Sequence, residues 1–176
     1  MASLIGTGPR QYLLGCEDFR SFDELKAAFD GELQPTDPIE RMWVDELVDL
    51  EWSLHRLRNT RRAVLETRLV DHLVNLAVLA RGERRSERLP SPAVLQEAAR
   101  GYIRGVPDAR DYIHMMTGFI QLEVELQVVQ AGAFDVLSRV EHTIHATSRV
   151  RDAILTRLYG RRDAIADGRI ASGRTR

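Results

Sequence analysis

The chain has 176 residues, enough for one domain with a substantial core, and its 44% hydrophobic and 29% charged content is typical of a folded protein. A single cysteine, Cys16, excludes an internal disulfide and a thiolate metal cage within one chain. The longest apolar run, residues 76–80, is far too short to span a bilayer. The first residues lack the pattern of a secretory signal, so we expect a cytoplasmic protein that does not bind membranes.

The net charge of −1 hides an uneven distribution along the chain. Residues 17–51 carry a net charge of −9, whereas the residues after Glu51 carry +7. Such an asymmetry favours antiparallel or head-to-tail pairing of chains, or contact between the basic part and a polyanion. Arginine supplies 24 of the 25 basic residues, a bias that a GC-rich genome explains without any functional preference for guanidinium.

The first helix is predicted to begin at a capping box. Residues 1–20 contain three glycines and one proline and predict an N-terminal arm. The sequence SFDE at 21–24 follows, in which the serine caps a helix and the glutamate reaches back to the cap. Apolar residues then recur at helical spacing as far as Leu33, so we expect a short helix that ends between Gly31 and Pro35.

A long helix is predicted over residues 38–81. Asp37 supplies an N-cap, Pro38 suits the first helical position, and Glu40 is placed to reach back to the cap. Residues 39–81 contain neither proline nor glycine, and the next residue is a glycine that can end the helix. Such a helix is about 66 Å long, which one compact core cannot cover, so it must pack along another long helix.

The two tryptophans of this helix predict that it is covered on two sides. Trp43 begins an apolar seam of alternating four- and three-residue steps, the spacing of a coiled coil. Trp52 lies nine residues further on and therefore points to the opposite side. If both rings are buried, the helix belongs to a bundle of more than two helices or to an oligomer; a partly exposed Trp52 is the alternative.

A third, short helix is predicted after a charged linker at residues 83–90. Ser91 is a suitable N-cap and Pro92 suits the first helical position. Gly105, with a proline two residues later, is expected to end the helix.

Helical patterns then continue almost to the end of the chain. We expect helices over residues 108–130 and 134–166 with a break at Gly132, and one continuous helix is the alternative. Residues 168–176 form a basic tail. The predicted fold class is all-α: one helical domain over residues 21–167, an elongated hairpin or bundle with coiled-coil-like long helices.

Two pairs of side chains at i, i+3 spacing suggest a metal hypothesis: Asp111 with His114, and His142 with His145. In four-helix bundles, carboxylates and histidines at this spacing project from one helix face and build di-metal sites. Glu123 lies in an apolar run and is a candidate for a facing carboxylate. The set lacks the paired Glu-x-x-His motifs of such sites, and solvated histidines are common beside an apolar stripe. The favoured interpretation therefore assigns the chain no metal and no cofactor.

Arg58, Arg61 and Arg62 share one face of the long helix. Several guanidinium groups on one face can neutralise phosphates and release counterions, which suits nucleic acid. The favoured interpretation is structural: the arginines form ion pairs with the acidic first third of the long helix of a partner. The acidic candidates are Asp45, Glu46 and Asp49.

Several segments carry a family resemblance. They are GTGPR (6–10), LLGCEDF (13–19), ELQPTDPIE (32–40), LVDLEWSLHRLR (47–58) and LSRVEHTIHATSRVRDAILTRL (137–158). With these motifs the chain resembles a widespread bacterial family of small, uncharacterised, predicted-helical proteins whose members open with a TGP element. The resemblance implies an α-helical fold and adds no mechanism.

The sequence contains no glycine-rich nucleotide loop and no nucleophile motif, so we predict no catalytic residues and no enzyme. We predict a structural or adaptor protein that acts by helical self-assembly as a homo-oligomer, or by contacts with a helical protein partner. The alternative is a nucleic-acid-associated protein using the three arginines, and the third hypothesis is a bundle-core metalloprotein. The predicted interface consists of seam positions Trp43, Leu47, Leu50, Leu54 and Leu57, with Leu137, Val140 and Ile144 opposite.

Overall fold

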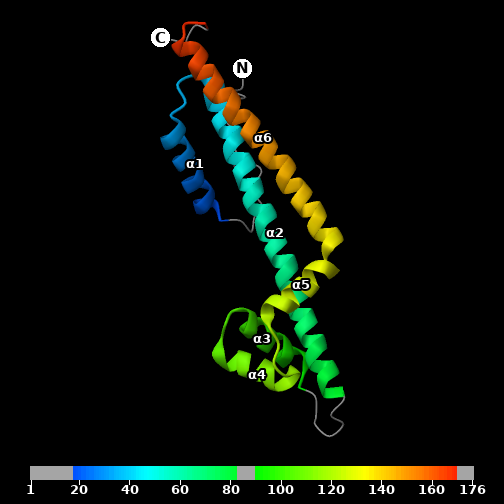
Figure 1. Cartoon of the computed structure of the whole chain (residues 1–176). Coiled ribbons are helices and arrows are strands. Elements are labelled where there is room, and N and C mark those ends of the chain that lie inside the picture. The colour runs from blue at the N-terminus through cyan, green and yellow to red at the C-terminus, as the bar shows by residue number, and fades with distance from the viewer. Residues whose placement is uncertain (1–17, 83–89, 170–176) are drawn as a thin grey trace, which may run out of the picture. The chain divides into compact units, whose positions relative to one another are not determined.

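The structure, a computed structural model, describes residues 18–82 and 90–169 (Figure 1). Within these ranges it contains six helices and no strand, which confirms the all-α prediction. The helices are α1 (Phe19–Leu33), α2 (Pro38–Gly82), α3 (Pro92–Ile103), α4 (Pro107–Thr117), α5 (Leu122–Gly132) and α6 (Phe134–Ala166). Almost all of the predicted N-terminal arm, charged linker and basic tail lies outside the described residues.

The contacts divide the chain into two compact units. Unit 1 consists of residues 1–57 and 143–176, and unit 2 consists of residues 58–142. The sequence predicts one domain over residues 21–167, whereas the structure distributes this range over both units. Each unit is therefore described by itself.

Helix α1 begins two residues before the predicted capping box. Its N-cap is Asp18, whose carboxylate accepts a hydrogen bond from the Arg20 N–H at 3.0 Å. The Ser21 hydroxyl, which the sequence analysis placed at the cap, instead donates to the Asp18 carboxylate at 2.6 Å. An aspartate is as good a cap as a serine, so the earlier residue starts the helix and the predicted start is wrong.

Helix α2 begins as predicted, with Asp37 as its cap. The Asp37 carboxylate accepts from the N–H groups of Ile39 and Glu40 at 2.8 and 2.9 Å. Glu40 does reach backwards, but it accepts from the N–H and hydroxyl of Thr36, at 2.9 and 3.1 Å, instead of from the cap residue. Glu40 is only 1% exposed, and no other charged residue among those described is buried.

The core of unit 1 covers α2 on two sides. Trp52 is 8% exposed, and the ring of Phe22 from α1 packs edge-on against it with centroids 5.4 Å apart. Another group of buried residues joins α2 to α6: Val44 and Leu47 cluster with Ile154 and Leu158. The expectation that α2 is covered on two sides therefore holds in unit 1, and helices of the same chain provide the cover.

Ion pairs set the antiparallel register of α2 and α6 in unit 1. Figure 1 shows the start of α2 beside the end of α6, with the helices running in opposite directions. Three links join the pair, two between the start of α2 and residues 161 and 162 near the end of α6, and one between residue 51 of α2 and the earlier residue 151 of α6. They are Asp37–Arg161 at 2.8 Å, Glu40–Arg162 at 3.0 Å and Glu51–Arg151 at 3.1 Å. The acidic beginning of α2 thus meets basic residues of α6.

Both carboxyl groups at the start of α2 have a lowered pKa. Burial alone raises the pKa of Glu40, but hydrogen bonds from Arg162 and from the Thr36 N–H outweigh it and hold the pKa below its ordinary 4.5. The Arg161 guanidinium, and then the Glu40 N–H, hold the pKa of Asp37 below its ordinary 3.8. Each carboxylate therefore stabilises the fold above its ordinary pKa and loses this effect as the pH falls through its lower folded-state pKa.

Unit 2 packs α3, α4 and α5 against the second half of α2. Leu73 of α2, Ala99 and Tyr102 of α3, Ile113 of α4 and Val129 of α5 share one buried cluster. The backbones of α3 and α4 come so close that a Cβ added at Gly101 would lie 2.6 Å from the Cβ of Ala109. Only glycine fits at position 101 without a shift of the backbone.

The helix predicted over residues 108–130 is wrong, because the chain breaks it into α4 and α5. Gly118 adopts a φ of +81°, and its N–H caps α4 through the carbonyl of His114 at 2.8 Å. The non-helical link that follows is held by Tyr102, whose hydroxyl donates to the Ile120 carbonyl at 3.3 Å. The break lets α4 and α5 each place a residue in the same core. The break predicted at Gly132 is present, since α5 ends there and α6 begins at Phe134.

We expect the Glu40→Gln variant to lose about 2 kcal/mol of unfolding free energy at neutral pH. A fully buried pair costs ~3–5 kcal/mol when one partner is removed, but the Arg162 side chain is still 31% exposed and keeps part of its solvation. In urea titrations, the wild-type free energy should decline below about pH 5, and that of Glu40→Gln should decline less. Glu32→Gln, at an exposed position of α1, is the control. Identical pH profiles for Glu40→Gln and wild type would contradict this account.

Candidate functional site

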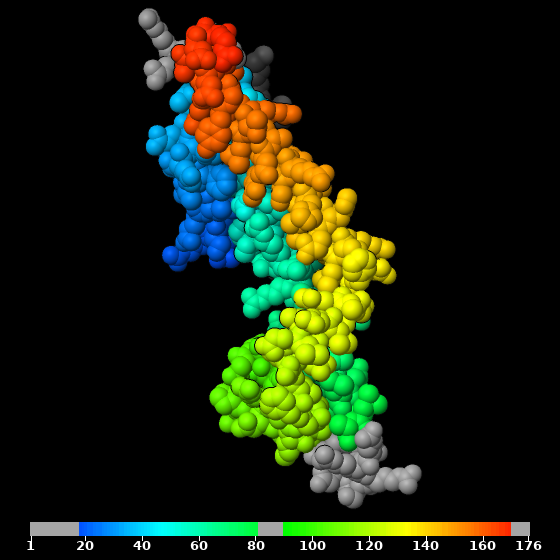
Figure 2. Space-filling model, viewed as in Figure 1, coloured from blue at the N-terminus to red at the C-terminus, as the bar shows by residue number. Residues whose placement is uncertain are grey.

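Helix α5 carries apolar residues on two opposite faces. The inner face packs into the core of unit 2 and consists of Leu122, Leu126 and Val129. At about 100° per residue, a second set at i, i+4 and i+7 lies on the other side. This set, which we call the outer face of α5, consists of Val124, Val128 and Ala131. All three residues are exposed, with relative exposures of 47% for Val124 and 51% for Val128. Figure 2 shows the α5 segment, in yellow, at the surface.

A polar contact and the core hold α5 on α2. The imidazole Nε2 of His72 lies 2.6 Å from the Glu125 carboxylate, and both side chains are partly buried. The sequence shows an apolar run around Glu123, but nothing in it points to a contact between Glu125 and His72, which lie 53 residues apart. Together with Val129 in the core, this contact fixes the rotation of α5, so the outer face is presented by a rigid helix.

The end of α5 leaves further apolar and small residues accessible. Phe134, the first residue of α6, is 68% exposed. A Cβ added at Gly132 would find no atom within 4 Å, so the backbone is open to approach there. In the sequence, the outer face is therefore followed by a glycine that is open to approach and by an exposed aromatic residue.

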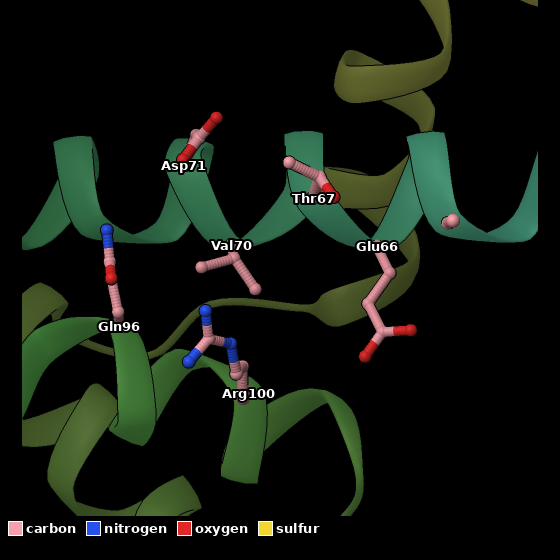
Figure 3. Close-up of a pocket in the computed structure, with 7 residues that line it drawn as sticks. Glu66, Thr67, Val70, Asp71, Gln96 and Arg100 are labelled. Atoms are coloured by element: carbon pink, nitrogen blue, oxygen red, sulfur yellow. The ribbon is translucent and has the colours of Figure 1, made fainter. Parts of the chain in front are cut away.

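A cleft with a volume of about 310 Å³ lies between α2 and α3 in unit 2 (Figure 3). Its lining residues are Ala63, Glu66, Thr67, Val70, Asp71, Gln96 and Arg100. In Figure 3, Gln96 and Arg100 extend from α3 toward α2, and Glu66 extends from α2 toward α3. Arg100 also lies 3.7 Å from Glu97, one turn earlier on α3. The cleft offers hydrogen-bonding groups of both charges, and no histidine or cysteine is among its lining residues.

A second cleft, of about 280 Å³, lies beside the link between α4 and α5. Tyr102 and Phe119 line it together with Arg110. The Phe119 ring is stacked on His114 at 5.1 Å, and the His114 ring meets Tyr102 edge-on at 5.5 Å. Burial raises the pKa of the Tyr102 hydroxyl, although the nearby Arg110 opposes this shift. These contacts explain how an exposed phenylalanine is held in place on a short link.

The structure gives the predicted metal candidates separate environments. His114 accepts a hydrogen bond from the Ile120 N–H at 3.5 Å, and its Nε2 is buried without a partner among the described residues. Asp111, Glu123, His142 and His145 are exposed. Across residues 18–82 and 90–169, no group of three or more histidine, cysteine or carboxylate side chains is placed to hold a metal ion. Glu123, the candidate for a facing carboxylate under the metal hypothesis, is exposed to solvent.

The predicted arginine cluster is at the surface. Arg58, Arg61 and Arg62 are all exposed, and Arg61 lies 2.5 Å from Glu141 of α6 in the same unit. The acidic partners proposed from sequence were on the first third of the long helix. Asp45, one of these, instead pairs with Lys26 of α1 at 2.6 Å. The ion pair of Arg61 is therefore intramolecular and involves a different carboxylate.

The residues predicted to form an interface differ in burial. Leu47 and Leu54 are fully buried within the single chain. The other predicted interface residues are partly buried: Trp43, Leu50, Leu57, Leu137, Val140 and Ile144. Leu47 packs against α6 residues of its own chain, so the strongest part of the predicted seam belongs to the intramolecular core.

No protein-family model, curated protein or solved structure matches the chain. The family resemblance of the motifs therefore remains a prediction. None of the described helices has both the length and the apolar character needed to cross a membrane.

Replacing Arg58, Arg61 and Arg62 together by glutamate separates the structural role of these residues from a nucleic-acid role. Since Arg61 and Glu141 are both more than a third exposed, we expect a loss of less than about 1 kcal/mol of stability, largest at low salt. Urea titrations at two salt concentrations measure this loss. Salt-dependent binding of wild type to a DNA or RNA oligonucleotide that the triple variant lacks would instead favour the nucleic-acid hypothesis.

Adjacent valines on α5 test the two faces of this helix. Val129→Ala should destabilise the protein by about 1–3 kcal/mol, because it removes buried methyl groups and leaves a cavity. Val128→Ala should change stability by no more than about 0.5 kcal/mol, since the side chain is half exposed and alanine favours the helix. Thermal or urea denaturation measures both. Equal losses at the two positions would mean that the outer face is part of the folded core.

Proposed function

We propose that this chain is a non-enzymatic helical module that acts by binding protein through the outer face of α5. The observation that carries the proposal is that α5 is apolar on two faces while the fold covers only one of them. A helix that is apolar on opposite sides is normally covered on both. In unit 1, α2 has two apolar faces and its own chain covers each one.

The arrangement of the exposed residues supports this assignment. Single exposed apolar side chains are normal on protein surfaces, but Val124, Val128 and Ala131 form a row along one helix. Phe134 follows this row in the chain, and aromatic side chains are enriched at interfaces. The rigid anchoring of α5 lowers the entropy lost on binding, because no segment needs to be ordered.

The geometry favours binding over catalysis. The larger cleft, between α2 and α3, is lined by polar side chains without a histidine or cysteine. The partly buried ion pairs Asp37–Arg161 and Glu40–Arg162 have a structural use, since they join the start of α2 to α6. Both features support recognition or stability, and neither of them involves the outer face of α5.

In-cell cross-linking tests the proposal. A photo-reactive amino acid at position 128 should give a discrete protein–protein product, because the outer face is in contact with a protein. The same residue at Gln130, exposed on another side of α5, should give little product. Val124→Asp should abolish the product at 128. If position 128 gives no discrete product of any mass, the proposed function is wrong.

A further inference from the structure

We propose that the cleft between α2 and α3 binds a free α-amino acid with a small aliphatic side chain, in its zwitterionic form (Figure 3). This site is additional to the protein contact proposed above, because the residues that line the cleft do not include the outer face of α5. The two proposals are therefore tested independently, and the failure of one leaves the other unchanged.

The cleft presents one charge of each sign from opposite walls. In Figure 3, the Glu66 side chain extends from α2 toward α3, and the Arg100 side chain extends from α3 toward α2. Among the described residues no ion pair joins these two, and the Arg100 guanidinium lies 3.7 Å from Glu97, too far for a hydrogen bond. A ligand with an ammonium and a carboxylate group suits both walls, whereas a ligand with a single charge meets a like charge on one of them.

A further polar residue accompanies each of the two charges. Gln96 lies one helical turn before Arg100, so its amide and the guanidinium share one face of α3 and can donate to the same carboxylate. Thr67, which follows Glu66, also lines the cleft, and its hydroxyl can accept from an ammonium group. Glu66 and Gln96 are half-buried, and neither has a polar partner among the described residues. Their hydrogen-bond partners must come from the contents of the cleft.

The size of the cleft and its apolar wall limit the ligand. A volume of about 310 Å³ is that of about ten water molecules at ~30 Å³ each, so the ligand has no more than about ten non-hydrogen atoms. Val70, which is only 6% exposed, points from α2 toward α3 in Figure 3, and Ala63 also lines the cleft. This wall suits a short aliphatic side chain such as that of alanine, valine or leucine.

Asp71 narrows the class of amino acid further. This residue is exposed and lines the cleft together with Glu66 and Arg100. Two carboxylates and one guanidinium give the lining residues a net charge of −1. A ligand that carries a second carboxylate is therefore repelled, and we expect L-aspartate to bind more weakly than L-valine.

Two-dimensional NMR of the ¹⁵N-labelled full chain tests for the site. The small size of the ligand and the open cleft lead us to expect a Kd for L-valine of about 0.1–10 mM. Titration to several times the upper end of this range should shift the amide signals of residues 63–71 and 96–100 along saturable curves. The signals of α1, in unit 1, are the internal reference.

Two analogues of valine test the need for both charges. Isobutylamine lacks the carboxylate of valine, and isovalerate lacks its ammonium group. Each analogue should bind the wild-type chain at least about tenfold more weakly than L-valine, because it loses charge-assisted hydrogen bonds to one wall of the cleft. Amide shifts caused by ionic strength alone are recognised with the same concentrations of sodium chloride.

Charge-removing variants assign each wall to its group. Arg100→Gln should weaken valine binding at least about tenfold and remove the preference for valine over isobutylamine. Glu66→Gln should weaken it similarly and remove the preference for valine over isovalerate. Arg104→Gln, at an exposed position of the α3 C-cap, and Glu32→Gln, exposed on α1, are the matched controls and should bind valine as wild type does. Circular dichroism and thermal melts check that each variant folds.

These measurements leave a clear route to rejection. If L-valine gives no saturable shifts in unit 2, the inference is wrong. It is also wrong if either analogue or L-aspartate binds the wild-type chain as tightly as valine does, because the charges of the cleft would then not select a zwitterion.

Discussion

The antiparallel contact between the acidic start of α2 and the basic end of α6 is the constraint on which unit 1 depends. Glu40 is almost fully buried, so its charge must be compensated: the Arg162 guanidinium neutralises it, and the Thr36 N–H and hydroxyl donate hydrogen bonds to it. Asp37 caps α2 and also binds Arg161, which couples the start of one helix to the end of the other. A slip of the register would leave a buried carboxylate without its cation. The charge pairs therefore select the register, and the apolar contacts supply most of the stability.

Each unit contains a helix with two apolar faces, but both faces are covered in unit 1 and only one is covered in unit 2. In unit 1, Phe22 of α1 covers one side of α2, and Ile154 and Leu158 of α6 cover another. In unit 2, the core covers the inner face of α5 and leaves Val124 and Val128 exposed. Retaining an uncovered apolar face costs solubility, so a binding role is the physical reason we favour for it. Contact with a protein, expected from the length of α2, is thus proposed through α5, because α2 is already covered in unit 1.

The sequence correctly predicted the helix ends that are set by residues adjacent to them in the chain, such as N-caps, prolines and glycines. Asp37 with Pro38, and Ser91 with Pro92, mark helix starts that the structure contains, and the break after Gly132 is also present. The predictions failed where another part of the chain changes the local preference. The break at Gly118 is an example: the non-helical link after it is held by Tyr102 of α3, which helical periodicity does not reveal. The sequence did not reveal the outer face of α5 as a candidate site, because its periodicity allows either apolar face of this helix to be turned toward the core.

The sequence by itself determined the all-α class, the extent of α2 and α6 and the asymmetry of charge, because these depend on caps, on the absence of helix breakers and on composition. Tertiary structure alone decided which charges meet, such as Arg61 with Glu141, and that His72 orients α5. It also decided that Leu47 is an intramolecular core residue while Val128 is exposed. Periodicity identifies the faces of a helix that avoid water, but only packing assigns each face to the core or to the surface.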